Sequence, residues 1–407
     1  MAQIRQKANI SLDVWFEVID HFLYDRSTLL ASALTCSAWL PRARVHLYSS
    51  VALYKPETYR LFSRTIAGSP SLGALVKELE LDVNTIQFKL WNDPSEADVL
   101  FPIEAARNLT GLHSLSLSND SHHYIHPNVL DFIPRFAIAT SLTKLLISDF
   151  GGRSPKTIIR ILEHFPHIRE FTLDGYFSKD DSYDPTETLP SDFCKNLRKL
   201  ILIDNVLVAP FLAVMPDHIT HLWLGRCFLI HGPTDPKVSY TDLARFKKLE
   251  SLTLQTHHLD GIDWVAEALS HARCDELRSL TLVYQCECRR TCRTTIAQQH
   301  TEISRLAGII LRRPAFRQLQ TLSVSVDADL DANLEKGLED VDDATELKRR
   351  HMRGLDDVLR GCRDREIQVE IEVNVYRQLS IQREAAKLVP ECTVWQQLIH
   401  QLITDLK

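Results

Sequence analysis

The spacing L-x-x-L-x-L recurs along most of this 407-residue chain. Leu249, Leu252 and Leu254 show its clearest form, and successive copies usually lie about 25 to 35 residues apart. Because side chains alternate between the two faces of a strand, the last two apolar positions of each copy point the same way. We therefore expect a short strand at each copy and a core beneath one face. The other copies begin at Val76, Leu112, Leu142, Ile168, Leu197, Ile219, Leu277 and Leu319.

A short strand that returns at this period, with helix-like sequence between the copies, is typical of a leucine-rich repeat. Two copies carry the longer form of the pattern, with Asn205 and Cys227 three positions after the last apolar residue. One repeat cannot bury its apolar face alone, so neighbouring repeats must stack. The sequence thus predicts an α/β fold, an irregular leucine-rich-repeat solenoid with a curved parallel sheet and outer helices, over residues 51–375. An ordinary α/β domain is the alternative, but it does not explain the recurring spacing.

The segments between the copies carry apolar residues at helical spacing. The alternating segment 367–373 predicts a last strand. Residues 376–407 predict a helical tail that would cover the edge of the sheet. Helices are expected over residues 56–67 and around Ile158, Trp264 and Ile303.

The first fifty residues contain no copy of the repeat and show helical periodicity instead. Ser11 and Ser27 are expected to cap the first two helices, and Pro41 suits the first turn of a third. Three helices within residues 8–50 make a small core, so we expect the bundle to pack against a neighbouring part of the chain or against a partner protein. The first helix should present Val14, Val18 and either Ile19 or Phe22 on one face, and the second should carry Leu30, Ala31, Leu34 and Ala38.

This N-terminal segment resembles the F-box motif. Residues 10–14 (I-S-L-D-V) stand where the family has L-P-x-E-[IL], and residues 34–39 (L-T-C-S-A-W) match its V-C-x-x-W-like centre. Ser11 replaces the usual proline and Asp13 the usual glutamate. The spacing between the two parts fits the family, and an F-box followed by leucine-rich repeats is a common layout, especially in fungal F-box proteins. Other apolar positions of the motif are Ile19, Leu23, Leu29 and Leu47.

The resemblance implies that residues 8–50 dock on the Skp adaptor, which links F-box proteins to a cullin ubiquitin ligase, while the repeats hold a protein substrate. The alternative is a plain three-helix cap on the end of the solenoid, because repeat arrays need such caps. Carried over position by position, the residues that contact the adaptor or support that contact would be Ile10, Ser11, Val14, Ile19 and Trp39.

Outward strand positions should line the concave surface of such a fold, and most of them are small or polar. Four larger residues stand out there: Ile201, Trp223, Arg226 and Tyr284. Trp, Tyr and Arg are frequent anchors of protein interfaces, so these positions are the candidate substrate contacts. Trp223 is the first candidate, and the alternative is that a neighbouring side chain or a loop covers it.

Two segments suggest metal sites without meeting their requirements. Cys286, Cys288 and Cys292, with Cys274 and His300 nearby, lack the second short-spaced pair of a typical zinc site and lie among arginines. Residues 327–333 resemble the start of a calcium-binding loop, but the glycine and glutamate that an EF-hand needs are missing. This favours a solvated, mobile acidic loop that extends to Glu346. We predict no metal, no cofactor and no set of catalytic residues.

Net charge and cysteine usage limit the partners and the compartment. The net charge is −6 and the pI about 6.3, which gives no reason to expect nucleic acid or a membrane as a partner. Nine cysteines without a regular framework fit the reducing cytosol or nucleus. The sequence therefore predicts the substrate-recognition subunit of a Skp–cullin–F-box ubiquitin ligase. A repeat scaffold without ligase function is the second hypothesis, and an enzyme built on a repeat shell the third.

Overall fold

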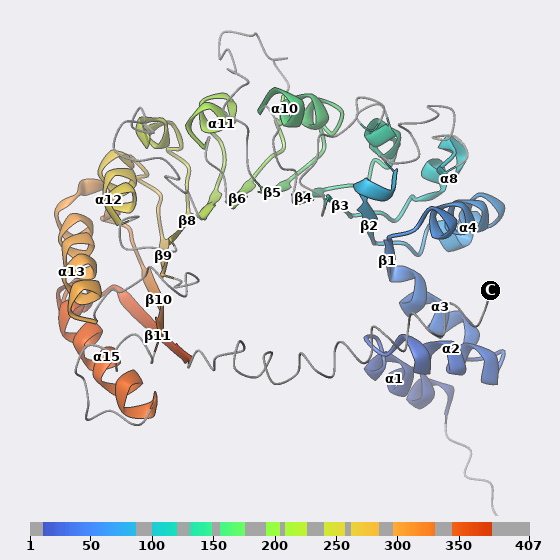
Figure 1. The fold of residues 1–407 in the computed structure, drawn as a ribbon, viewed down its shortest axis with the longest axis horizontal. Helices are drawn as coiled ribbons and strands as arrows, with labels where there is room; N and C mark the ends of the chain where they lie inside the picture. Colours follow the sequence, from blue (N-terminus) through green and yellow to red (C-terminus); the bar gives the residue numbers. More distant parts are fainter. Residues whose placement is uncertain are drawn as a thin grey trace, which may run out of the picture. The chain divides into compact units, whose positions relative to one another are not determined.

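The computed structural model describes residues 11–86, 100–119, 129, 132–148, 155–175, 193–203, 208–225, 240–256, 262–284, 296–329 and 344–376. Strands and helices alternate along the chain (Figure 1). Within these ranges, eleven strands form one sheet, in which spatial order follows sequence order. The strands are β1 (Ser50–Leu53), β2 (Glu78–Asp82), β3 (Ser114–Ser118), β4 (Lys144–Ser148), β5 (Glu170–Asp174), β6 (Lys199–Ile203), β7 (His221–Gly225), β8 (Ser251–Thr256), β9 (Ser279–Tyr284), β10 (Thr321–Asp329) and β11 (Gln368–Tyr376).

The chain divides into two compact units, which are described separately. The first unit comprises residues 1–253 and 271–277, and the second comprises 254–270 and 278–407. Neighbouring strands from β1 to β7 pair in parallel, as do those from β9 to β11. This order and the strand at every L-x-x-L-x-L copy confirm the predicted α/β fold of leucine-rich-repeat type.

The apolar positions of the repeat form the core. In the repeat of β3, for example, Leu112 before the strand and Leu115 and Leu117 within it are buried, and the serines between them are partly exposed. Within the first unit, backbone hydrogen bonds of 2.7 to 3.0 Å connect each repeat to the one before it at the residue that precedes the strand. Together the two features fix the register, so that one face of each strand from β2 to β7 is apolar and buried. The donors and acceptors in the first unit are Lys77 to Ser49, His113 to Lys77, Thr143 to His113, Arg169 to Thr143, Arg198 to Arg169, Thr220 to Arg198 and Glu250 to Thr220.

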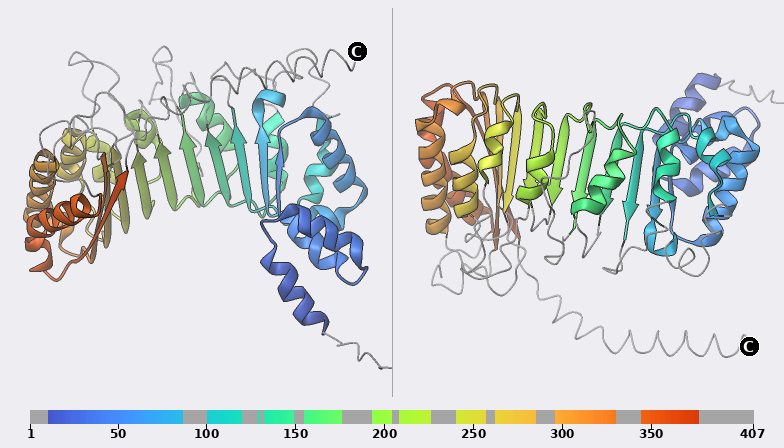
Figure 2. Two further views of the ribbon diagram at one scale, coloured as in Figure 1. Left: turned by 60° about the horizontal axis from the view of Figure 1, so that its bottom comes forward. Right: turned by 90° about the horizontal axis from the view of Figure 1, so that it is seen from above.

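The return segments of the first unit cover one face of its sheet (Figure 2). Aromatic residues fill the space beneath the strands: the rings of Phe101 and Phe136 lie 5.0 Å apart, and that of Phe171 on β5 lies 6.1 Å from that of Phe211 on α11. Side-chain amides also join successive returns, as Asn108 donates to the Ile66 carbonyl over 2.9 Å. These segments are α4 (Pro56–Gly68), α5 (Pro70–Gly73), α8 (Ile103–Asn108), the 3-10 helix η1 (Ile133–Ile138), α10 (Pro155–Glu163), α11 (Val208–Val214) and η2 (Tyr240–Arg245).

Strand β1 was not expected from the sequence. It contains no copy of the repeat, only Val51 and Leu53 at alternating positions, yet both side chains are buried. Its four residues pair in parallel with β2, from Ser50 opposite Glu78 onward. The sheet therefore begins one strand before the first recognisable repeat.

Three helices precede β1, as predicted: α1 (Leu12–His21), α2 (Arg26–Thr35) and α3 (Leu40–Ser49). Ser11 is the N-cap residue of α1, and Pro41 lies in the first turn of α3. The expected cap of α2 is wrong, because Asp25 and not Ser27 occupies that position. Its carboxylate accepts from the backbone N–H groups of Ser27 and Thr28, both at 3.1 Å.

Helix α2 also ends earlier and faces differently than expected. It stops at Thr35, so Ala38 lies beyond it. Its buried residue is Leu29, whereas Leu30 and Leu34 are exposed. The apolar positions chosen from the sequence thus lie on the outer side of this helix.

The second unit contains α12 (Ile262–His271, except its last residue), α13 (Ile296–Arg312), the 3-10 helix η4 (Pro314–Phe316), α15 (Ala344–Val358) and α16 (Arg360–Arg363) with strands β9 to β11. The predicted last strand is β11. The expectation of a solvated loop over residues 327–346 is wrong at both ends, because Asp327–Asp329 continue β10 and pair with Asn374–Tyr376, and α15 begins at Ala344. The predicted tail over 376–407 lies outside the described residues, except Tyr376, which ends β11.

Helices α13 and α15 pack closely through two histidines. The Nε2 atom of His300 lies 2.7 Å from the Nδ1 atom of His351, and their ring centroids are 4.9 Å apart. A methyl group at Gly354 would lie 2.0 Å from the His300 ring, so only glycine allows this approach. Burial lowers the pKa of His351 to about 4, and the neighbouring His300 adds to the effect.

A buried leucine and its exposed neighbour on β4 test the assignment of the two faces. Leu145 is fully buried, whereas Leu146, the next residue, is partly exposed on the opposite face. Leu145→Ala should lower the free energy of unfolding by about 2 to 5 kcal/mol. Leu146→Ala should cost about 1 kcal/mol or less. Urea denaturation followed by circular dichroism measures both, and equal losses would contradict the assignment.

The histidine pair predicts acid sensitivity. In the unfolded chain His351 regains its ordinary pKa of 6.5, so between pH 6.5 and 4 the unfolded chain binds a proton that the folded chain does not. The free energy of unfolding should therefore fall as the pH is lowered through this window, by on the order of 2 kcal/mol from this residue. His351→Phe should show a shallower pH dependence in urea titrations at pH 7 and pH 5. An identical dependence in both proteins would exclude His351 as its source.

Candidate partner-binding surfaces

Helix α1 exposes apolar side chains that a globular protein would usually bury. Val14, Val18 and Phe22 follow one another at intervals of four residues and are 37% to 46% exposed. Four-residue spacing places them on one stripe along the helix. Leu12 and Leu23 at its two ends are exposed to a similar degree. We call Val14, Val18 and Phe22 the α1 stripe. It is the apolar face that the sequence predicted for this helix, but it faces away from the bundle.

The adjacent side of α1 is held against α3. Ile19 is buried there, and the Trp15 and Trp39 rings lie 4.7 Å apart, with Trp39 immediately before α3. Packing on this side orients the α1 stripe outward. Of the two candidates for the predicted apolar face, Phe22 therefore shares it with Val14 and Val18, and Ile19 does not.

A charged cluster secures the same contact between the two helices. The Nε atom of Arg42 donates to Asp20 over 2.6 Å, its Nη2 group pairs with the second carboxylate oxygen, and the His46 Nε2 atom lies 2.7 Å from Asp20. The hydrogen bond from Arg42 is the main reason that the pKa of Asp20 falls to about 2. Sequence reasoning missed this cluster, because nothing in the sequence pairs residues more than twenty positions apart.

The predicted adaptor residues fall into two groups. Ser11 and Val14 are exposed at the start of α1, and the Ser11 side chain makes no capping hydrogen bond. Ile19 is buried and Trp39 is half-buried, so these two support the helix and do not form its outer surface. Ile10 lies outside the described residues. The surface that a partner can reach from the predicted set is thus the region around Val14.

Two of the predicted substrate residues lie side by side. Ile201 on β6 pairs with Trp223 on β7, and both are partly exposed on the face opposite the buried leucines. The same register continues through Thr172 on β5 to Leu146 on β4. Leu146, Thr172, Ile201 and Trp223 therefore form one row across four strands, which we call the sheet-face row. It contains more apolar side chains than the sequence analysis singled out.

A row of charged and polar residues runs next to it. Lys144, Glu170, Lys199 and His221 are also in register across β4 to β7. The Lys199 ammonium lies 3.7 Å from the Glu170 carboxylate, and both side chains are about 40% exposed. An apolar row beside a mixed-charge row is the composition of many protein-binding surfaces. These rows could not be recognised in the sequence, because they depend on which residues pair between neighbouring strands.

The other two predicted substrate residues do not join this surface. Arg226 lies outside the described residues. The outward placement of Tyr284 is wrong: its side chain is buried, because it stands two positions after Leu282 and so points to the same, inner face. Its hydroxyl is buried, without a hydrogen-bond partner in the described part of the chain, and burial raises its pKa above the ordinary value.

Metal-binding groups do not gather in the described part of the chain. Within it, no cluster of three or more His, Cys, Asp or Glu side chains could hold a metal ion. Cys274 is buried, which raises the pKa of its thiol to about 12, and His300 faces His351. Cys286, Cys288 and Cys292 lie outside the described residues. None of the helices in the described ranges combines the length and apolar character needed to span a membrane.

Comparison with known structures gives distant neighbours. No family model and no curated protein matches the chain. A crystal structure of the leucine-rich repeat-containing protein LegL7 from Legionella pneumophila aligns with 18% identity and a TM-score of 0.43, covering 74% of this chain and 84% of the other. A chain of the Rad7 and Elc1 complex in yeast aligns with 13% identity and a TM-score of 0.35, covering 79% of each chain. Neither likeness is close enough to carry a functional assignment, so function must be argued from the surfaces above.

Proposed function

We propose that this chain is an F-box protein with leucine-rich repeats, the substrate-recognition subunit of a Skp–cullin–F-box ubiquitin ligase. The observation that carries the proposal is the exposed α1 stripe, because it lies in the segment that resembles the F-box motif. In this proposal residues 8–50 dock on the Skp adaptor, residues 51–375 bind the target, and residues 376–407 follow as a tail.

The α1 stripe has the features of a docking helix. Apolar side chains at intervals of four residues are the usual anchors when a helix lies in an apolar groove. Covering an exposed Val or Phe side chain contributes up to about 1.5 to 3 kcal/mol when burial is complete. Val14, Val18 and Phe22 together could therefore supply much of the affinity for an adaptor. Ile19, Trp39 and the Asp20–Arg42 pair would act indirectly, by holding α1 in place.

The sheet-face row is the proposed contact with the substrate. Trp223 and Ile201 would be its anchors, since large side chains in the middle of an interface contribute most of the binding energy. The chain itself would catalyse nothing and would need no cofactor. It would raise the effective concentration of the bound target beside the ubiquitin-conjugating enzyme, because the Skp adaptor and the cullin connect that enzyme to this chain. The assembly would act in the cytosol or the nucleus.

A scaffold without ligase function is the second candidate. Ser11 and Asp13 depart from the F-box consensus at two of its first positions, and this observation favours the alternative. In that case α1 to α3 would only cap the repeats, and the sheet-face row would bind a protein partner by itself. The two hypotheses differ in one property, which is binding of the Skp adaptor.

Titration calorimetry of the purified chain with the Skp adaptor tests the proposal. Wild type should bind, and the double variant Val14→Asp, Val18→Asp should bind at least about tenfold more weakly, because two charges would enter an apolar interface. Ile138→Asp is the matched control: this residue is as exposed as Val18 but lies in η1, outside the three helices, so the affinity should not change.

Circular dichroism must first show that both variants melt like wild type. The absence of binding by folded wild type would reject the ligase hypothesis and leave the scaffold. Unchanged affinity of the double variant would show that the α1 stripe is not the docking surface.

A further inference from the structure

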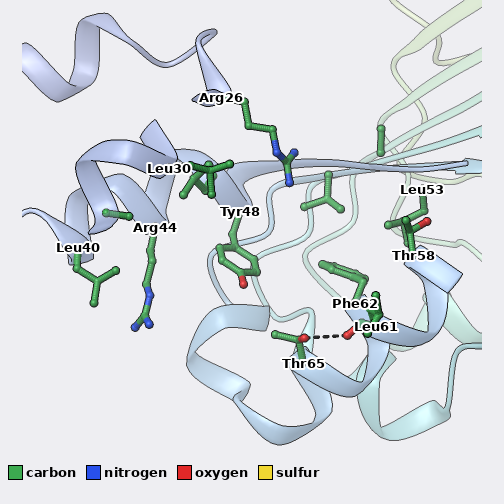
Figure 3. Close-up of a pocket in the computed structure, with 14 residues that line it drawn as sticks. Arg26, Leu30, Leu40, Arg44, Tyr48, Leu53, Thr58, Leu61, Phe62 and Thr65 are labelled. Atoms are coloured by element: carbon green, nitrogen blue, oxygen red, sulfur yellow. Dashed lines mark hydrogen bonds between the residues drawn. The ribbon is translucent and has the colours of Figure 1, made fainter. Parts of the chain in front are cut away.

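A cleft of about 420 Å³ lies where the three N-terminal helices meet the start of the repeats (Figure 3). It is lined by side chains from α2, α3, β1 and α4, all within the first unit. Its volume falls in the range of pockets that hold small molecules, about 300 to 1,000 Å³. Neither the α1 stripe nor the sheet-face row contributes a residue to it.

The walls of the cleft are mostly apolar. Val51, Leu53 and Phe62 are buried side chains at its inner side. Leu30 on α2 and Leu61 on α4 border it from different elements and are about half exposed. In Figure 3, Leu30 and Phe62 lie on opposite sides of the space beside Tyr48. Exposed leucines around a hollow mark a surface that an apolar group would cover.

Two arginines give the cleft a positive charge. Arg26 on α2 and Arg44 on α3 both line it, and the side chain of neither forms an ion pair or a hydrogen bond with another described residue. The contrast is Arg42, two positions from Arg44, which pairs with Asp20. Among the described residues that line the cleft none is acidic. Figure 3 shows the Arg26 guanidinium extending toward the space beside Tyr48.

We propose that this cleft binds a small amphipathic anion, an apolar body that carries a carboxylate or phosphate-ester head. The body would cover Leu53, Leu61 and Phe62, and the head would accept hydrogen bonds from Arg26, while Arg44, whose guanidinium lies on the other side of Tyr48 in Figure 3, would add positive charge. Guanidinium groups suit both heads, because their planar donors bind paired oxygens. A protein partner is the less suitable occupant, since stable protein interfaces need far more surface than this cleft offers.

Such a ligand would connect two parts of the first unit. Arg26 and Arg44 belong to the three-helix segment, whereas Leu53 and Phe62 belong to β1 and α4 of the first repeat. A molecule that contacts both sides binds only when they are in their folded arrangement. Ligand binding should therefore raise the melting temperature of the chain. This role is independent of adaptor binding and of the proposed ligase function.

Titration calorimetry of the full chain with four probes tests the proposal. Octanoate and octyl phosphate carry both required parts, whereas 1-octanol lacks the charge and inorganic phosphate lacks the apolar body. At least one of the two amphipathic anions should bind in a 1:1 ratio and raise the melting temperature, and the stronger of them identifies the head group. The 1-octanol and phosphate probes should bind at least about tenfold more weakly, because each loses one of the two contributions.

Variants assign the binding to this cleft. Arg26→Gln combined with Arg44→Gln should weaken the amphipathic anion about tenfold or more, and leave 1-octanol unchanged. Leu61→Gln should also weaken binding of the amphipathic anion, because it removes an apolar contact with the body of the ligand. Arg64→Gln is the matched control, since Arg64 is an exposed arginine on α4 that does not line the cleft, and it should bind like wild type.

Three results would overturn the proposal. One is equal binding of octanoate, octyl phosphate and 1-octanol, which would indicate an apolar hollow without an anion site. The second is unchanged binding by the double arginine variant, provided that it melts like wild type. The third is displacement of the bound anion by the Skp adaptor, which would make the cleft part of the adaptor interface.

Discussion

Burial of three apolar side chains in every repeat is the constraint on which the rest of the structure depends. A single strand such as β3 cannot cover Leu112, Leu115 and Leu117 by itself, so each repeat is stable only beside its neighbours. The backbone hydrogen bonds between successive repeats, such as His113 to Lys77, set the register of the strands. Once the register is fixed, the residues on the opposite face are left to form rows that can serve binding.

The same constraint explains where binding surfaces can arise. Core positions cannot change without loss of stability, whereas the outward positions of a strand are under no such restriction. The sheet-face row uses these positions. At the N-terminal end, α3 finishes at Ser49 and β1 begins at Ser50, so no residues separate the three helices from the sheet. The cleft with Arg26 and Arg44 lies at this junction, where the helices and the repeat fold meet.

The repeat pattern made most of the fold predictable. Every strand with an L-x-x-L-x-L copy was found, because that spacing directly reflects which side chains enter the core. Strand β1 was missed because two alternating apolar residues, Val51 and Leu53, are too short a signal and only pairing with β2 reveals them. Asp327–Asp329 were expected in a loop because acidic residues rarely favour strands, yet pairing with β11 outweighs that preference.

The candidate sites were less predictable than the fold. Val14 was expected at a partner surface, and its exposure agrees with that expectation without showing a partner. The expected outward position of Tyr284 is wrong because the alternation of β9 continues beyond Leu282, which puts Tyr284 on the same buried face as Leu282. The Asp20–Arg42 pair, the sheet-face row and the cleft all join residues from different elements. Such contacts depend on tertiary packing, which no local pattern encodes.

Hydrogen–deuterium exchange of the complete chain, with and without the Skp adaptor, tests the central claim most directly. If α1 to α3 form the docking segment, backbone amides of residues 12–49 should exchange more slowly in the complex, with the largest change along α1, while the strands β4 to β7 stay as they are. No change in residues 12–49, or protection centred on the sheet-face row, would contradict the account.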